Sequence, residues 1–220
     1  MPKLHQMNEE EVVRRYLMLL LETNNRFDLL NAVHAGRLGM TDNFAAEYGF
    51  FQLRRICETM ALGALTLHGD LEGVSANKFL REYHAQRIFN LLSRVHEHCF
   101  PQPVKRIEVG GEIRIEADHE RGALTFQEFN TLYNRCGHLA HRGSLHSLQK
   151  AYEGADALKG EIRDWHEKLA RLLEIHLVPR LTGNSAFLFS LRAENGRPAC
   201  SLFGPPSDDG TLPVRLFAIG

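Results

Sequence analysis

The sequence has no surplus of charge of one sign and no long apolar run. Its 26 lysines and arginines nearly balance 27 aspartates and glutamates, for a formal net charge of -1. A near-neutral chain has no global positive field for nucleic acid, so any RNA contact needs a local basic patch. No apolar stretch approaches the length of a membrane span. Acidic residues 9–11 and the lack of a small-residue cleavage site indicate no signal peptide, so we expect a cytoplasmic protein without membrane contact.

Paired cysteines and common cofactor motifs are also missing. The four cysteines occur singly, with no CxxC pair, which favours reduced thiols over disulfides. There is no glycine-rich phosphate loop, no nucleophile elbow and no carboxylate cluster. We therefore predict no cofactor and no metal. A metal site from Cys136, His138, His141 and His146 is a less favoured alternative, because this spacing matches no zinc pattern.

The composition is that of an ordinary globular protein. Hydrophobic residues make up 44% and charged residues 24% of the 220 residues, so the chain can bury a real core. We predict a helical domain over residues 1–181 with a β-hairpin inserted at residues 104–117. A β appendage over residues 182–220 follows and packs on the same domain.

Residues 124–143 (LTFQEFNTLYNRCGHLAHRG) have helix signals at both ends. Thr125 and Glu128 form a capping box, in which the hydroxyl accepts the N–H of Glu128 and the carboxylate reaches back. Leu124 before the cap and Phe129 after it form a hydrophobic staple. The closing glycine is a natural stop. The segment therefore predicts one helix of about four turns.

This predicted helix has an apolar face and a polar face. At about 100° per residue, the apolar stripe contains Phe129, Leu132, Tyr133, Cys136, Leu139 and Ala140. The other half contains Asn134, Arg135, His138 and His141. A solvated polar face is the simplest interpretation, and a site with one cation and two imidazoles is the functional one.

Arg135 followed six positions later by His141 resembles the signature of HEPN domains, in which a histidine follows an arginine at short spacing. Residues 51–70 also resemble the central helix of bacterial HEPN-like proteins, and the likeness covers roughly residues 8–180. The resemblance implies an antiparallel helical bundle. Many HEPN proteins are metal-independent endoribonucleases that act as homodimers.

The resemblance also implies roles for the residues of the polar face. His141 would be the general base on an RNA 2′-hydroxyl, and Arg135 would stabilise the charge that develops on the phosphate. His138 or Asn134 would assist, and the products would carry a cyclic phosphate. The residue types suit this chemistry, because imidazole titrates near neutral pH and guanidinium matches phosphate oxygens.

Four more helices are predicted from apolar spacing. Asn8 caps the first, in which the pattern fades at residues 23–25, so we expect a kink or a second short helix there. The second runs from residue 41 or 42 to about 67 and is apolar almost all round, so it should be the most buried. The third spans residues 75 or 77 to 98. The last, residues 148–176, has an apolar seam that can pack inside the monomer or form a homodimer interface.

Glu58 has two interpretations. It lies four residues after Arg54, so the two side chains can form a surface ion pair. Alternatively, Glu58 is a partly buried carboxylate of the catalytic site that orients Arg135 or a histidine. A partly buried carboxylate needs such a partner.

One local cluster of positive charge is predicted on the outer face of the third helix. A phosphate backbone could use it, although a solvated face explains the pattern as well. The candidate RNA-binding residues are Arg81, His84, Arg87 and Arg94, with Arg142 beside His141.

The hairpin at residues 104–117 alternates around two glycines. We predict a three-residue loop, residues 110–112, because this register places Val109 opposite Ile113 and keeps apolar residues on one face. The tail has a turn signal at Asn195-Gly196.

A two-residue loop at that turn would set Leu191 opposite Cys200 and Phe189 opposite Leu202. Residues 214–218 suggest a further strand. This small antiparallel sheet could also include the earlier hairpin.

These patterns predict a mainly α protein with small β additions (α+β). The architecture would be a HEPN-like antiparallel bundle with an inserted hairpin and a C-terminal antiparallel β-meander. The predicted function is RNA binding or cleavage through the Arg/His face. The alternative is a non-catalytic helical module that dimerises or binds a protein partner with the same surface.

Overall fold

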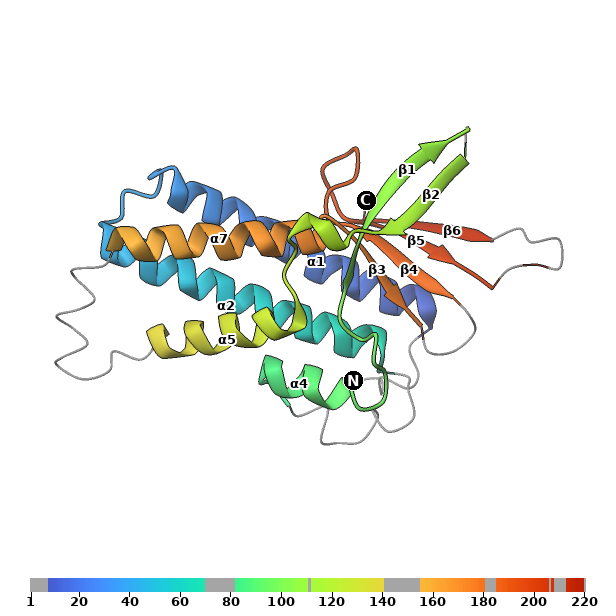
Figure 1. The fold of residues 1–220 in the computed structure, drawn as a ribbon, viewed down its shortest axis with the longest axis horizontal. Coiled ribbons are helices and arrows are strands. Elements are labelled where there is room, and N and C mark those ends of the chain that lie inside the picture. Colours follow the sequence, from blue (N-terminus) through green and yellow to red (C-terminus); the bar gives the residue numbers. More distant parts are fainter. Residues whose placement is uncertain are drawn as a thin grey trace.

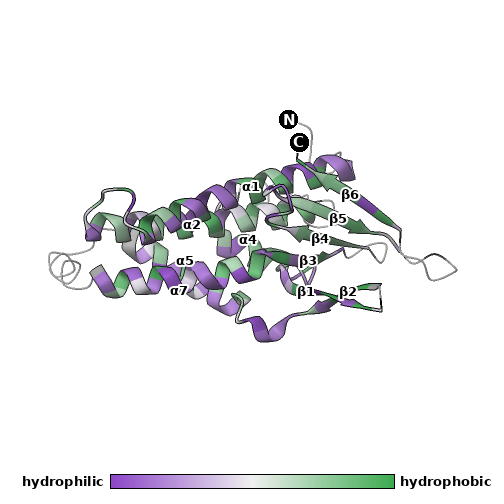
Figure 2. Ribbon diagram, turned by 90° about the horizontal axis from the view of Figure 1, so that it is seen from above, coloured by the Kyte–Doolittle hydropathy of each residue, from purple (hydrophilic) through white to green (hydrophobic). Residues whose placement is uncertain are grey.

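The computed structural model describes residues 8–69, 82–110, 112–140, 155–180, 185–205, 207 and 213–219. It is a mixed α+β fold, in which long helices fill one end of the molecule and a six-stranded antiparallel sheet fills the other (Figure 1). Seen from above, the strands extend the long axis beyond the helices (Figure 2). The α+β class is confirmed, and the sheet is larger than the predicted additions.

Helix α1 (Glu9–His34) begins at the predicted cap, where the side chain of Asn8 accepts the N–H of Glu11. No second helix begins at residues 23–25, because α1 is continuous there. The hydroxyl of Thr23 donates to the carbonyl of Leu19, and the amide of Asn24 donates to the carbonyl of Leu191. Polar side chains with such partners need not break a helix.

Helix α2 (Asp42–Leu67) confirms the second predicted helix and lies at the centre of the bundle, in contact with α1, α4, α5 and α7. Its glycines allow close packing. A Cβ at Gly63 would lie 2.6 Å from the ring of Tyr16 on α1, and one at Gly49 would lie 2.8 Å from Ile162 on α7.

Helix α4 (Ala85–Leu92) is shorter than predicted. The predicted start at residue 75 or 77 lies outside the described residues. Tyr83 is exposed and precedes the helix. The carboxylate of Glu82 accepts the N–H groups of Tyr83 and His84, and such local bonds compete with helical ones.

Helix α7 (Ala155–Leu173) confirms the later part of the last predicted helix, and residues 148–154 lie outside the described residues. The helix ends before His176, which lies on strand β3 (Ile175–Pro179), so the predicted end is wrong. Its apolar seam is buried inside the monomer and packs against α2, with Ile162 and Leu169 fully covered.

Helix α5 (Phe126–Ala140) has the predicted capping box. The N–H of Glu128 donates to the hydroxyl of Thr125 at 3.2 Å, and the N–H of Thr125 donates to the carboxylate at 2.9 Å. Lys168 of α7 also donates to this carboxylate, and that hydrogen bond is the main reason why the pKa of Glu128 is lowered. Leu124 and Phe129 are both buried, as expected for a staple.

Replacement of Thr125 by alanine is expected to lower the free energy of unfolding by about 1 kcal/mol, because one end of the capping box is lost. Urea unfolding followed by circular dichroism measures this change. Thr131→Ala is the matched control, since Thr131 is exposed within the same helix and bonds only the carbonyl of Gln127. Equal unfolding energies for the two variants would contradict the capping role.

The strand order in the sheet is β2-β1-β3-β4-β5-β6. The strands are β1 (Gln102–Val109), β2 (Glu112–Ala117), β3, β4 (Ala186–Ser190), β5 (Ala199–Phe203) and β6 (Val214–Ala218). The hairpin therefore shares one sheet with the tail. The expected boundary at 181/182 falls between β3 and β4, which pair with each other.

Both predicted hairpin registers are wrong. Val109 pairs with Glu112, which leaves two residues in the first loop, with Gly110 at φ +62°. The strand ends are exposed there, so no buried face sets the register. In the tail, Phe189 pairs with Cys200, two positions from the prediction. A shift of two keeps every side chain on its face, and therefore apolar residues still meet.

None of the helices in the described part of the chain is both long and apolar enough to cross a membrane.

Candidate functional site

Helix α5 has its polar and apolar side chains on opposite faces, as the spacing of about 100° per residue predicts. Asn134 and His138 are exposed, and Arg135 is half-buried beside them. Phe129 and Cys136 are buried on the opposite side. Two other candidate residues, numbers 141 and 142, lie outside the described residues.

Arg135 is held by helix α7. Its Nε and Nη2 donate to the two carboxylate oxygens of Glu161 at 2.9 and 2.8 Å, and its guanidinium lies 5.8 Å from the ring centroid of Phe50. The hydrogen bond to Glu161 raises the pKa of Arg135 and lowers the pKa of Glu161. A bidentate pair of this kind fixes the guanidinium. Arg135 therefore joins α5 to α7 and does not contact Glu58.

Glu58 instead forms the predicted surface pair with its own helix. Its Oε1 accepts from Nε of Arg54 at 3.1 Å, and its Oε2 accepts from Nη1 of Arg55 at 2.8 Å. Arg54 also donates to the hydroxyl of Tyr133 on α5 at 3.1 Å, and its guanidinium lies 4.7 Å from that ring. Gly137 makes room, because a Cβ there would lie 3.3 Å from Nη1 of Arg54.

His84 completes this group at the N-cap of α4. Its ring meets the ring of Tyr133 edge to face, with 4.8 Å between centroids. Its Nδ1 is buried without a hydrogen-bond partner among the described residues. Burial, and next the charge of Arg87, lower the pKa of His84, so the imidazole is neutral at neutral pH. We name Arg54, Glu58, His84 and Tyr133 the α2–α4–α5 cluster.

The sequence pointed to only half of this cluster. Glu58 and His84 were candidates, but on separate predicted surfaces. The sequence pattern indicates Arg54 only as a partner of Glu58 on the same helix, and Tyr133 only as a residue of the apolar stripe. The signal that could have found Tyr133 is its phenolic hydroxyl, because a buried tyrosine needs a polar partner.

Three of the predicted RNA-binding residues, His84, Arg87 and Arg94, lie in the described part of the chain. His84 turns into the cluster, whereas Arg87 is exposed, with 4.0 Å between its Nη1 and Oε2 of Glu82. Arg94 is exposed beyond the end of α4. The remaining two, numbers 81 and 142, lie outside the described residues.

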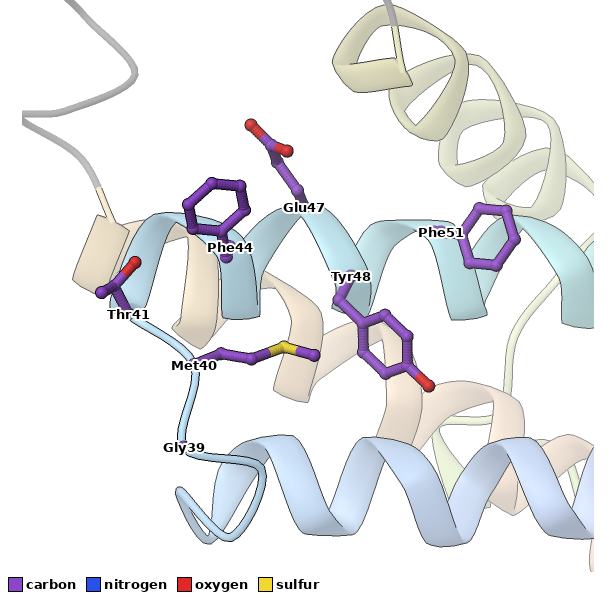
Figure 3. A pocket seen from close by; sticks show the side chains of 7 residues that line it. All are labelled: Gly39, Met40, Thr41, Phe44, Glu47, Tyr48 and Phe51. Carbon is purple, nitrogen blue, oxygen red and sulfur yellow. The ribbon is translucent and has the colours of Figure 1, made fainter.

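Two surface hollows accompany these helices. The first, about 610 Å³, lies at the start of α2 (Figure 3) and is lined by Gly39, Met40, Thr41, Phe44, Glu47, Tyr48 and Phe51. The second, about 340 Å³, lies along α7 and is lined by Glu161, Asp164, Trp165, Glu167, Lys168 and Arg171. Neither is lined by Asn134, Arg135 or His138, although Glu161 belongs to the second.

The described part of the chain contains no group of three or more histidine, cysteine or acidic side chains that could hold a metal ion. Cys136 is buried and His138 is exposed, so the two ligands of the alternative metal site that are described lie on different sides of α5.

The described residues form an α+β protein, in which a helical bundle packs against one antiparallel sheet. A comparison with protein-family models, curated proteins and solved structures found no match to this chain.

Proposed function

We propose that this protein is a metal-independent, endoribonuclease-like RNA-binding protein, with the α2–α4–α5 cluster as its reacting centre. The observation that carries the proposal is the ring of Tyr133, which contacts both the imidazole of His84 and the guanidinium of Arg54, and burial lowers the pKa of that imidazole. A neutral imidazole can accept a proton, and a guanidinium can stabilise charge on a phosphate. Three helices hold these groups, which favours a fixed geometry.

The proposed step is an intramolecular transfer. His84 takes the proton of an RNA 2′-hydroxyl, whose oxygen attacks the neighbouring phosphorus while the bond to the 5′-oxygen breaks, and that oxygen takes up a proton from water. The product is a cyclic phosphate and a free 5′-hydroxyl. Arg54 stabilises the charge on the phosphate oxygens, with Glu58 and Tyr133 as positioning residues. Exposed Arg87 supports binding to flanking phosphates.

The HEPN resemblance supplies a competing centre within the same function. There His141 is the base and Arg135 binds the phosphate, assisted by His138 or Asn134. Arg135 is paired with Glu161 much as Arg54 is paired with Glu58, so the ion pairs do not separate the two centres. We prefer the α2–α4–α5 cluster because its imidazole and its guanidinium both contact the ring of Tyr133.

Cleavage of a cytoplasmic RNA pool in excess chelator tests the proposal. We expect His84→Gln to lower the cleavage rate by about 100-fold or more, the usual loss for a general base. His119→Gln is the matched control, because His119 is exposed on the short 3₁₀ helix His119–Arg121, and it should cleave at the wild-type rate.

The other outcomes separate the alternatives. Loss of cleavage in His141→Ala but not in His84→Gln would assign the reaction to the Arg135 and His141 pair of the HEPN resemblance. Equal cleavage by every variant identifies a contaminant and overturns the nuclease proposal.

A second candidate is a non-catalytic helical module that dimerises or binds a partner. The observation that favours it is the row of large apolar side chains left exposed on α2, among them Phe44 and Phe51. Absence of cleavage together with a stable complex would support this module.

A further inference from the structure

The rings of His68 and His96 meet edge to face in a buried position outside the α2–α4–α5 cluster. His68 is the C-cap of α2, and His96 lies in the connection that follows α4. The two residues are 2% and 4% exposed, and their ring centroids lie 4.7 Å apart. His68 lies about 15 Å further along α2 than Glu58, so the pair is a separate feature of the fold.

Each of these two rings has a buried nitrogen without a hydrogen-bond partner in the described structure. The two atoms are Nε2 of His68 and Nδ1 of His96. A buried polar atom normally bonds to protein, to an ordered water or to an ion, because leaving it unpaired costs free energy. Two such atoms on rings in contact are best satisfied by one ligand that both rings share.

His96 is already oriented as a metal ligand. Its Nε2 lies 2.9 Å from the carbonyl oxygen of Pro179, at the end of β3. Because a carbonyl only accepts, Nε2 carries the proton of the neutral ring and Nδ1 has the free lone pair. Metal-binding histidines usually donate their second ring nitrogen to a carbonyl or a carboxylate in this way, which fixes the tautomer and the ring.

His68 has the protonation state that a metal ligand needs. Burial lowers its pKa to about 3, so the ring is neutral at neutral pH. The charge of Arg180 also acts on this ring, but Nη1 of Arg180 donates to the carboxylate of Glu9 at 2.7 Å, which balances that charge. The surroundings of His68 therefore leave room for a cation.

The separation of the two rings fits a single ion. Two imidazoles whose nitrogens bind one zinc ion at about 2.0–2.1 Å have ring centroids roughly 5 Å apart in a tetrahedral site. The observed 4.7 Å between the centroids of His68 and His96 is close to this value. Imidazole is a ligand that suits zinc, whereas calcium and magnesium prefer oxygen.

A third imidazole borders the pair on the solvent side. The ring centroid of His98 lies 6.2 Å from that of His96, and its side chain is 54% exposed beside Glu97. No three such side chains in the described residues are already arranged around an ion, so His98 has to move roughly 1 Å inward to join them. Its exposure also gives an ion a path from solvent.

We propose that His68 and His96 bind one zinc ion, with His98 as the third ligand and water as the fourth. The ion joins the end of α2 to the connection after α4. Through the carbonyl of Pro179 it also supports β3, so it strengthens the junction between the helices and the sheet. The site is independent of the nuclease proposal, whose reaction uses no metal.

Calorimetric titration of the chelator-treated full chain with zinc at neutral pH tests the site. We expect one ion per chain. His68→Leu and His96→Gln should lower the affinity about 100-fold or more, because even the outer partners of metal ligands contribute about 10–100-fold. Glutamine at position 96 keeps a donor for Pro179 and removes Nδ1. His119→Gln is the matched control, because His119 is exposed on a different element, and it should bind zinc as the wild type does.

Thermal unfolding gives a second readout. Zinc at about 100 times its dissociation constant should raise the midpoint of the wild type by about 5 °C or more and leave that of His68→Leu unchanged. His98→Gln changes an exposed residue, so its fold is not at risk, and it should lower the affinity about 10-fold or more. A wild type that takes up no zinc overturns the proposal. Uptake that all three variants retain also overturns it, since the ion would then bind exposed histidines elsewhere.

Discussion

Acidification from pH 7 to about pH 5 is expected to unfold this protein cooperatively. Three buried histidines carry the effect, because burial lowers the pKa of His68 to about 3 and those of His166 and His176 to about 4. The charge of His96, and then of Arg180, adds to the shift at His68. All three imidazoles are therefore neutral in the folded protein at neutral pH.

The direction follows from proton binding. Unfolding restores the pKa of each histidine to about 6.5, so between pH 6.5 and the folded pKa values the unfolded chain binds more protons than the folded chain. The contribution of these three imidazoles to the free energy of unfolding is fully present above pH 6.5. This contribution decreases as the pH drops below that value, and the decrease ends only below the pKa values of the folded protein. By pH 5 each of these histidines lowers the free energy of unfolding by about 2 kcal/mol. The three losses together approach the whole stability of a typical domain.

Circular dichroism against pH measures the transition, and His68→Leu isolates one contributor. The Nε2 of His68 is buried without a hydrogen-bond partner in the described structure, so leucine removes the proton site without breaking a bond there. The acid midpoint of this variant should fall by about half a pH unit. His138→Gln, at an exposed position of α5, should leave it unchanged. An unshifted midpoint for His68→Leu, or a wild type still folded at pH 4, would refute the account.

The sequence predicted elements well where one local signal decided them. The cap of α1, the span of α2 and the capping box of α5 rest on residues a few positions apart, and all three are present. Registers failed because they depend on which face is buried after the sheet has formed. The spacing of His176 fits the predicted helical seam, but the residue lies on β3 and its Nε2 meets Tyr16 of α1.

The candidate site shows the same division. The helical spacing predicts the polar face of α5. The partner of Arg135, however, is Glu161 of α7, and no local sequence pattern gives the orientation of that helix. The cluster of Arg54, His84 and Tyr133 joins three helices that are far apart in sequence. Only the packing of α2 at the centre of the bundle brings them together.

The buried pair of Tyr16 and His176 should be the most sensitive polar contact between helices and sheet. The Tyr16 hydroxyl lies 2.9 Å from Nε2 of His176, and Nδ1 of His176 lies 3.1 Å from the carbonyl of Leu173. Because a carbonyl only accepts, Nδ1 carries the proton and Nε2 accepts from the phenol. Burial raises the pKa of Tyr16 well above its ordinary value, so the phenol keeps its proton. Phe189 packs on both rings.

Replacement of His176 by alanine is expected to lower the free energy of unfolding by about 4 kcal/mol. The substitution leaves a cavity in the core, and the phenol of Tyr16 and the carbonyl of Leu173 lose their hydrogen-bond partner. Tyr16→Phe leaves only the imidazole nitrogen without a partner and should lower the free energy of unfolding by about 1–3 kcal/mol. Urea unfolding at pH 8, above the titration of the histidines, measures both changes.

The double variant Tyr16→Phe/His176→Leu decides whether the hydrogen bond itself matters. Once the imidazole has been replaced by leucine, the phenol is already unpaired, so its removal no longer strands a buried group. The second substitution should therefore cost less in the His176→Leu background than in the wild type, with a coupling of about 1 kcal/mol or more. Additive costs would mean that the two rings contribute only by packing. The connection between α1 and the sheet would then rest on apolar contacts such as that between Tyr16 and Phe189.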